Sequence, residues 1–423
     1  MDWKWIDPQM AEQGISLLRR LIEQGYEGYF VGGCVRDELM GRPVNDMDIA
    51  TNATPEQVMN IFEHTIPTGI AHGTITVIMN GEQFEVTTYR TESDYTDHRR
   101  PEQVQFVSDL YEDLRRRDFT MNAIARGIDG SYVDPFHGQE DLEQGIIRCV
   151  GDPEERFEED ALRMLRGIRF SSVFDFTIEP ATWQALVHRR SLIRYIAAER
   201  IRVEMEKMIA GLYPFKGIRL LQESELVPDM KINVPCPPEQ PELLMRLADI
   251  PADPAVLRWT LIVMAMGLDS ERMKPYMKEW TFSNAFMDQV SRLLRMNERL
   301  LTAAGTDAEE SLFEVYISAV VHYGRETALQ WQQLYPVLMD NEQQQLAIFA
   351  EHGKQWLDEM NIFSLGDVEI NGQELLAALQ AKGGPWLGKL MNEILLATAA
   401  GQLDNTREAI LDYARQQYEK RDN

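Results

Sequence analysis

Two aspartates, Asp46 and Asp48, have the spacing that most directly suggests chemistry in this sequence. They alternate with Met47 and Ile49, so on a strand both carboxylates point to one face while the apolar side chains enter a core. Parallel carboxylates repel each other unless a cation lies between them, and oxygen ligands of this kind suit Mg²⁺. The spacing therefore predicts a magnesium site, although an exposed strand edge or an Asx turn would give the same pattern.

A glycine pair, Gly32-Gly33, closes the short apolar run 28–31 a dozen residues before these aspartates. Paired glycines let the backbone approach a ligand closely, and the N–H groups at a helix N-terminus can bind phosphate. Arg36 adds a positive charge in the first turn of the expected helix. The pattern suits a phosphate-binding turn, while an ordinary structural turn remains the alternative.

A third carboxylate, Glu85, is a further candidate for the metal site. It lies between Phe84 and Val86, so its side chain should point away from the face that enters the core. An exposed glutamate without a role on a strand would look the same.

A basic segment lies further along the chain, between residues 158 and 170. Its charged positions recur at every third residue and are Asp160, Arg163, Arg166 and Arg169. The apolar positions between them are Leu162, Leu165 and Ile168. This spacing predicts one amphipathic helix with a polar stripe, which would be either a binding face or a solvated face of ion pairs.

The elements that must position these residues fall into two classes. Residues 74–79 and 84–89 are β-rich and flank the hairpin sequence Asn80-Gly81, so the first 150 residues should contain one sheet. From about Pro153 onward the apolar period becomes helical. The predicted fold class is therefore α+β, with an N-terminal sheet domain followed by an all-α remainder.

Composition sets limits on the class of protein. A chain of 423 residues is too long for one core, and its three cysteines lack the spacing of a zinc site or a disulfide framework. We find no run long enough to cross a bilayer and expect a cytoplasmic protein. The net charge of −26 argues against a general nucleic-acid binder, although arginines cluster in the first 170 residues and could line a basic groove.

Further motifs follow the glycine pair and the two aspartates in a fixed order. They are Arg116-Arg117-Asp118-Phe119-Thr120-Met121-Asn122-Ala123, then Asp134-Pro135-Phe136 to Gly138, then Glu159-Asp160-Ala161-Leu162-Arg163-Met164-Leu165-Arg166. Together they resemble the polymerase β-type nucleotidyltransferases, and among these the class II tRNA nucleotidyltransferase and bacterial poly(A) polymerase family. The resemblance is strong over residues 25–210 and rests only on helical character beyond them.

This resemblance implies a domain order and an activity. The implied domains are a polymerase β-type nucleotidyltransferase head at 1–149, a neck at 150–210, a helical body at 211–325 and a helical tail at 326–423. The implied reaction adds CCA to the 3' end of tRNA from CTP and ATP without a nucleic-acid template, and releases pyrophosphate by a two-metal mechanism. The implied partners are the nucleotides and the acceptor and TΨC arms of the tRNA, whereas the oligomeric state stays open.

The resemblance also implies roles for particular residues. Asp46 and Asp48 would hold Mg²⁺, with Glu85 as the third catalytic carboxylate. The implied nucleotide-binding residues are Gly32, Gly33, Arg36, Arg117, Asp118, Asp160, Arg163, Arg166 and Arg169. Among them, Arg117 and Asp118 would contact the sugar or the triphosphate.

Base selection follows from the shape of the base edges. Cytosine and adenine both present a ring-nitrogen acceptor beside an amino donor, which a carboxylate on Asp160 and a guanidinium on Arg163 can match. Guanine and uracil present the inverse pattern, and polar groups left unpaired in a buried site discriminate by about 10⁴-fold. We therefore expect CTP and ATP to be accepted and GTP and UTP to be refused.

Several alternatives remain. A bacterial poly(A) polymerase shares every motif above and differs in its reaction with CTP. Enzymes that add only CC or only A are also similar, although the charged stretch 90–100 resembles the flexible loop found where A is added. A catalytically inactive RNA-binding protein is disfavoured by the presence of Asp46 and Asp48. An antibiotic-modifying nucleotidyltransferase is disfavoured by the basic segment 158–170.

Overall fold

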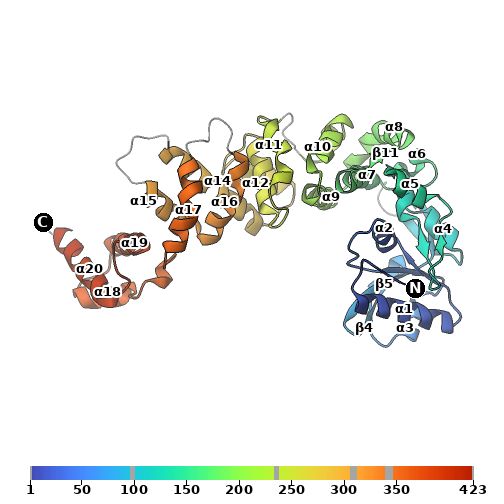
Figure 1. Cartoon of the computed structure of the whole chain (residues 1–423), viewed down its shortest axis with the longest axis horizontal. Coiled ribbons are helices and arrows are strands. Elements are labelled where there is room, and N and C mark those ends of the chain that lie inside the picture. Colours follow the sequence, from blue (N-terminus) through green and yellow to red (C-terminus); the bar gives the residue numbers. More distant parts are fainter. Residues whose placement is uncertain (1, 96–100, 233–237, 305–311, 339–345, 422–423) are drawn as a thin grey trace. The chain divides into compact units, whose positions relative to one another are not determined.

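Strands occupy only the N-terminal half of the chain in the part that the structure describes, and the rest of that part is helical (Figure 1). The structure, a computed structural model, describes residues 2–95, 101–232, 238–304, 312–338 and 346–421. Two compact units divide the chain, Met1–Val234 and Pro235–Asn423. The expected fold class is confirmed, whereas the four domain boundaries inferred from the sequence stay predictions.

A seven-stranded mixed sheet forms the base of the first unit, in the order β3-β4-β5-β2-β1-β8-β9. The strands are β1 (Gly28–Val31), β2 (Asp48–Thr51), β3 (Thr65–Gly69), β4 (Thr74–Met79), β5 (Glu82–Thr88), β8 (Ala125–Arg126) and β9 (Tyr132–Val133). The hairpin between β4 and β5 turns at Asn80 and Gly81, which have φ angles of 50° and 91°. Both central residues therefore have the positive φ that the sequence Asn-Gly predicts for a two-residue turn.

One face of this sheet is buried beneath α1 (Pro8–Glu23) and α3 (Pro55–Ile61). Met47 and Ile49 are 1% and 0% exposed in this core, where they lie with Phe30. Their burial is the reason that the acidic side chains next to them in sequence point the other way.

The charged stretch 90–100 is not the loop that the sequence suggested, at least over its first half. Arg90–Tyr95 form strand β6, which pairs antiparallel with β7 (Pro101–Phe106), from Arg90 opposite Phe106 to Tyr95 opposite Pro101. Residues 96–100 lie outside the described residues. Without an apolar alternation the stretch gives no strand pattern, and backbone pairing with β7 supplies the order instead.

Helices complete the first unit. They are α2 (Gly33–Leu39), α4 (Leu110–Arg115), α5 (Gly138–Gln144), α6 (Pro153–Glu159), α7 (Leu162–Phe174), α8 (Pro180–Arg189), α9 (Ala198–Ala210) and α10 (Pro214–Glu223). The single helix expected over 158–170 is wrong, because α6 ends at Glu159 and α7 begins at Leu162. Asp160 lies in the break with φ −137° and ψ 103°, which is extended backbone.

The described part of the second unit is helical. Its α-helices are α11 (Pro241–Met245), α12 (Val256–Ala265), α13 (Met273–Glu279), α14 (Asn284–Ala304), α15 (Leu312–Tyr323), α16 (Arg325–Leu338), α17 (Ala347–Glu359), α18 (Gly372–Leu379), α19 (Pro385–Ala399) and α20 (Arg407–Arg421). Three tryptophans, Trp259, Trp280 and Trp331, are among its largest fully buried side chains. Across the described ranges, no helix combines the length and the apolar character needed to cross a membrane.

Candidate active site

Two carboxylates lie opposite each other where β2 begins, and a third precedes the strand. Asp48 is the first residue of β2, and the parallel pairing with β5 sets it directly opposite Glu85. Asp46 precedes the strand instead of lying on it, so the expected strand pair of aspartates is correct only for Asp48. The register places Glu85 across from Asp48, and Asp46 is close enough to act on Asp48 through its charge.

The charges at this point are unbalanced. Burial and the nearby carboxylates of Asp46 and Glu85 together raise the pKa of Asp48 to about 6, although the charges of Arg117 and Arg36 act in the opposite direction. Among the described residues, none donates a hydrogen bond to the Asp48 carboxylate. A divalent cation would relieve this repulsion, so the residues fit the ion that the sequence predicts.

The carboxylates do not form a closed metal cage. Within the described ranges, no three Asp, Glu, His or Cys side chains converge closely enough to hold an ion by themselves. Mg²⁺ commonly binds to one or two carboxylates and takes its remaining ligands from water and substrate phosphates. These side chains could therefore supply only part of the ligands of such an ion.

The backbone at Gly32 lies close to the Asp48 carboxylate. Its φ of 72° and ψ of −129° lie in a region that side chains with a Cβ rarely adopt. A Cβ at this position would lie 3.0 Å from Arg117 Nη1 and 3.7 Å from Asp48 Oδ2. The turn of Gly32 and Gly33, which opens α2, thus lies directly beside the Asp48 carboxylate.

Arg36 is held inside the protein rather than extended toward solvent. Its guanidinium donates to both carboxylate oxygens of Asp37, at 2.9 and 2.8 Å, and to Asn122 Oδ1 at 2.7 Å. The same group lies 5.3 Å from the ring centre of Phe170 and 4.9 Å from that of Phe174. Arg36 therefore joins α2 to α7, and it influences Asp48 through its charge.

Arg117 lies between the glycine turn and a buried aspartate. Its Nη2 donates to Asp113 Oδ2 at 3.2 Å and its Nη1 to the carbonyl oxygen of Asn122 at 3.3 Å. Burial acts to raise the pKa of Asp113, but the guanidiniums of Arg116 and Arg117 outweigh it and hold that pKa below its usual range. Arg117 is thus fixed at one end, and its buried Nε has no hydrogen-bond partner among the described residues.

Four nitrogen atoms contact the Asp118 carboxylate. Oδ1 accepts hydrogen bonds from the Phe119 amide at 2.8 Å and from Asn122 Nδ2 at 2.9 Å, and Oδ2 accepts from Arg166 Nε at 2.7 Å and lies 2.6 Å from Arg166 Nη2 in the same ion pair. Burial opposes ionisation of Asp118, yet the charge of Arg166 and these bonds keep its pKa well below the usual range. The carboxylate is saturated, so a direct sugar contact would require it to exchange one of these bonds.

The arginines of α7 belong to the same buried network. Arg169 Nε donates to Glu204 Oε2 of α9 at 2.5 Å, and Arg166 Nη1 lies 3.9 Å from Glu204 Oε1. Arg169 also lies over the ring of Phe170 at 3.9 Å. The stripe therefore consists of ion pairs, as one alternative held, but these pairs are partly buried and link the loop after α4 to α7 and α9.

The side chains of Asp160 and Arg163 do not form an ion pair with each other. Asp160 accepts from Arg200 Nη2 at 2.9 Å and from the Leu162 amide at 3.1 Å. Arg163 is 7% exposed and donates to Glu159 Oε2 at 2.5 Å and to the carbonyl oxygen of Arg116 at 2.9 Å. Both lie where α6 meets α7, but each is held by a separate partner.

Sequence reasoning missed several members of this network. They are Asp113, Asn122, Glu159, Arg200 and Glu204. Asn122 and Glu159 lie within the quoted motifs, so their position was available, but Arg200 and Glu204 lie on α9 with nothing in their own spacing to connect them to the site.

The three segments 28–148, 175–230 and 255–414 each match a known family. In that order the families are described as Poly A polymerase head domain, as Probable RNA and SrmB- binding site of polymerase A, and as tRNA nucleotidyltransferase domain 2 putative. The CCA-adding enzyme of Enterococcus faecalis is 38% identical over 418 residues, which cover 98% of each chain. The chain belongs to the CCA-adding enzyme family. The CCA-adding enzyme of Anoxybacillus flavithermus is likewise 38% identical, over 415 residues.

Solved structures of CCA-adding enzymes have the same fold. The Bacillus stearothermophilus CCA-adding enzyme in complex with CTP is 33% identical, with a TM-score of 0.81 over 98% of this chain and 99% of that one. The Thermotoga maritima CCA-adding enzyme complexed with tRNA is 20% identical, with a TM-score of 0.65 over 98% of this chain and 97% of that one. The second likeness supports the fold alone.

Proposed function

We propose that this CCA-adding enzyme family member adds CCA to the 3' end of tRNA from CTP and ATP, without a nucleic-acid template and with release of pyrophosphate. One observation carries the proposal: the register of β2 and β5 sets Glu85 opposite Asp48, while Gly32 and Arg117 lie against the same carboxylate. A metal-binding acid and a backbone turn able to approach phosphate are thus adjacent. That combination suits transfer of a nucleotidyl group.

Mg²⁺ is the ion we assign to this site. Asp46 and Asp48 would hold it, with Glu85 as a further carboxylate on the neighbouring strand. Two bound ions would lower the pKa of the RNA terminal 3'-hydroxyl and neutralise charge on the triphosphate. The unpaired acid Asp48, whose pKa is raised to about 6 by burial and its acidic neighbours, supports this assignment.

The protein groups around the carboxylates would position the substrate. Backbone N–H groups at Gly32 and Gly33 and the positive charge of Arg117 lie on the side from which a triphosphate would approach Asp48. Arg36 and Asp118 hold the surrounding elements in place through Asn122. The 3'-hydroxyl oxygen would attack the α-phosphorus of the nucleotide, and the bond to pyrophosphate would break as the new phosphodiester forms.

Asp160 and Arg163 are the residues we assign to base reading. Arg163 would donate to the ring nitrogen of cytosine or adenine, and Asp160 would accept from the exocyclic amino group. Asp160 already accepts from Arg200, and Arg163 already donates to Glu159 and to the carbonyl oxygens of Arg116 and Arg156, so a base would share or displace these partners. Nucleotide binding would therefore act directly on the contacts where α6 meets α7.

A poly(A) polymerase is the second candidate, favoured by the family match of residues 28–148. The test uses purified protein and a tRNA transcript that lacks its 3' CCA, with CTP and ATP supplied separately and together. CCA addition gives products two residues longer with CTP and three longer with both nucleotides, and no product with GTP or UTP. A run of A residues from ATP alone, unaffected by CTP, would identify the poly(A) polymerase instead.

A further inference from the structure

Residues 2–6 form a short segment before α1, which we call the strap. The backbone amides of Lys4 and Trp5 donate to the two carboxylate oxygens of Glu38, on α2, at 2.9 and 3.1 Å. The carbonyl oxygen of Trp5 accepts from the amide of Val44 at 2.8 Å. The strap is therefore bonded both to α2 and to the segment that leads from α2 into β2.

A buried arginine joins the strap to β8. Arg126 is 8% exposed, and its Nη2 donates to the carbonyl oxygen of Asp2 at 3.1 Å. The guanidinium lies 4.7 Å from the ring centre of Trp3 and 5.3 Å from that of Tyr132, and its Nη1 lies 3.9 Å from Glu38 Oε1. Its Nε and Nη1 have no hydrogen-bond partner among the described residues. Because a buried charge is costly without partners, these contacts favour a single arrangement of the strap, α2 and β8.

The two segments bonded to the strap carry active-site residues. Glu38 is the next-to-last residue of α2, so the strap holds this helix at the end opposite the turn at Gly32. Asp46 precedes β2, so the pairing of that strand does not hold it. Val44, two residues before Asp46, pairs instead with Ile6 of the strap in an isolated parallel bridge. The strap therefore contacts both the helix that begins at the glycine turn and the segment that carries Asp46.

We propose that the strap is a positioning element for nucleotide transfer, which holds the glycine turn and Asp46 in their places around Asp48. The proposal rests on the proposed function, which supplies the metal ion and the triphosphate. The hydrogen bonds described above join the strap to Glu38, Val44 and Arg126, none of which we assign to the metal or the nucleotide. The strap thus acts through the placement of other groups, and a misplacement of about 1 Å can lower a rate by about 10²-fold.

The first test separates positioning from stability. Glu38→Ala removes both acceptors of the strap amides, so the kcat for CTP addition to a tRNA transcript should fall by about 5- to 100-fold, with an unchanged KM for the RNA. Asp7→Ala is the matched control, because the Asp7 carboxylate also accepts from two backbone amides, those of Gln9 and Met10, but it caps α1. Asp7→Ala should lower the stability and leave kcat unchanged.

The second test needs no catalysis, because hydrogen exchange of backbone amides reports local opening. In Glu38→Ala the amides of residues 32–36 and 44–48 should exchange faster than in the wild type and in Asp7→Ala. Mg²⁺ should slow exchange over residues 44–48 in the wild type and in Asp7→Ala, and less so in Glu38→Ala, where the segment of Asp46 is no longer held.

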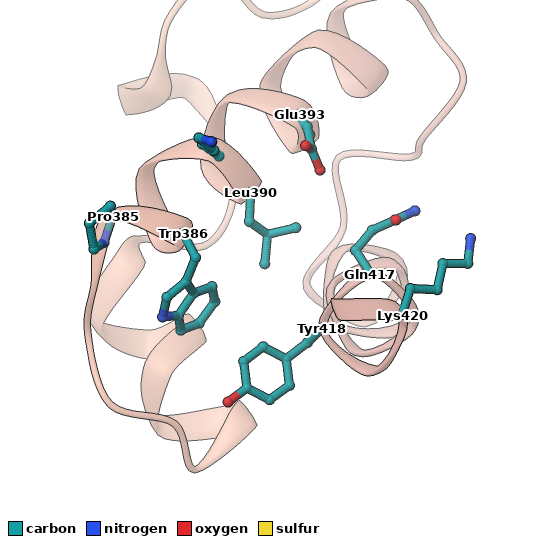
Figure 2. Close-up of a pocket in the computed structure, with 8 residues that line it drawn as sticks. Pro385, Trp386, Leu390, Glu393, Gln417, Tyr418 and Lys420 are labelled. Carbon is teal, nitrogen blue, oxygen red and sulfur yellow. The ribbon is translucent and has the colours of Figure 1, made fainter. Parts of the chain in front are cut away.

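Trp3→Ala approaches the strap from its other contacts. Trp3 covers Arg126 and meets Phe30 of β1 edge-on, with ring centres 5.1 Å apart, so its loss should also speed exchange over residues 32–36. Trp386→Ala is the matched control. Trp386 forms an equally close pair with Tyr418, with ring centres 5.0 Å apart, in a groove between α19 and α20 of the second unit (Figure 2). Its loss should leave exchange over these residues unchanged.

A combined variant tests whether Glu38 acts through the strap. Deletion of residues 2–5 keeps Glu38 but removes its two donors, so kcat should fall as in Glu38→Ala. Adding Glu38→Ala to the deletion should bring little further loss, because both changes break the same contact. Independent losses that multiply would show that Glu38 acts by another route and would overturn the proposal.

The outcomes distinguish this proposal from the proposed function. If the wild-type protein adds no C to the transcript, the proposed function fails, and the exchange measurements alone decide whether the strap orders residues 32–36 and 44–48. If Glu38→Ala and the deletion keep the wild-type kcat, or if Asp7→Ala loses as much kcat as Glu38→Ala, the strap only stabilises the fold and the proposal is overturned. A lowered kcat with an unchanged KM for the RNA, together with faster exchange at both segments, would establish it.

Discussion

Replacement of Asp48 by asparagine should stabilise the metal-free protein while abolishing its activity. The side chains have nearly the same shape, so the change removes a charge without leaving a cavity. Burial and the charges of Asp46 and Glu85 raise the pKa of Asp48 from 3.8 to about 6. At 1.36 kcal/mol per pH unit, this difference in pKa means that ionised Asp48 lowers the free energy of unfolding by about 3 kcal/mol at pH 7. Asp48→Asn should recover about 1–3 kcal/mol of unfolding free energy in the absence of divalent ions.

The direction of the pH dependence follows from that raised pKa. The folded state holds the Asp48 proton more tightly than the unfolded state, so stability is lost as the pH rises from about 4 to about 6. The gain from Asp48→Asn should therefore be absent near pH 4 and fully present above pH 6. Urea unfolding with EDTA at pH 4.5, 5.5 and 7 measures it.

The activity assay and the metal titration complete the test. Loss of a metal ligand removes several kcal/mol of transition-state stabilisation, so CTP incorporation should fall by about 10³-fold or more. Mg²⁺ should stabilise the wild type more than Asp48→Asn, since only the wild type presents the full charge. Glu82→Gln, on the same strand as Glu85, is the control and should change neither CTP incorporation nor the stabilisation by Mg²⁺. Equal stability of Asp48→Asn and wild type at every pH, or equal stabilisation of both by Mg²⁺, would refute the reasoning.

Three further changes test the neighbouring elements. Asp118→Asn leaves the partly exposed Arg166 with only the more distant Glu204 as its anion and should cost about 1–3 kcal/mol in urea unfolding at pH 7. Because the pKa of Asp118 is held low, that cost should shrink as the pH falls below about 4, and a constant cost would contradict the ion pair. Asp160→Ala combined with Arg163→Ala should weaken discrimination against UTP and GTP in single-nucleotide assays, whereas equal slowing with all four nucleotides would make these residues structural. Deletion of residues 92–98 should leave CC addition near normal and reduce A addition by orders of magnitude, because this stretch resembles the loop found where A is added. Full-length CCA ends at the normal rate would exclude a role of this segment in A addition.

The strands near the site were predictable because their information is local. The apolar alternation of β5 and the Asn80-Gly81 turn are complete within a few residues, and the structure follows both. The carboxylates of Asp48 and Glu85 could be singled out for the same reason. The register that sets these two residues opposite each other could not be predicted, because it depends on how two strands far apart in sequence pair.

The break between α6 and α7 could not be predicted in this way. The apolar period continues through Ala161, so nothing local ends the helix at Glu159. The break is accompanied by distant contacts, in which Asp160 bonds to Arg200 some forty residues later. Likewise Arg166 pairs with Asp118, which precedes α7 by more than forty residues. A spacing pattern within one helix contains no information on such partners.

The turn at Gly32 limits how this enzyme can vary over evolutionary time. Every single-base change in a glycine codon that alters the residue and keeps the reading frame open introduces a Cβ. At Gly32 that atom would meet a guanidinium nitrogen at 3.0 Å, in a backbone conformation that other residues rarely adopt. No small step therefore leads away from glycine here, and drift at this codon should be confined to synonymous changes even in lineages where the remaining surface diverges freely.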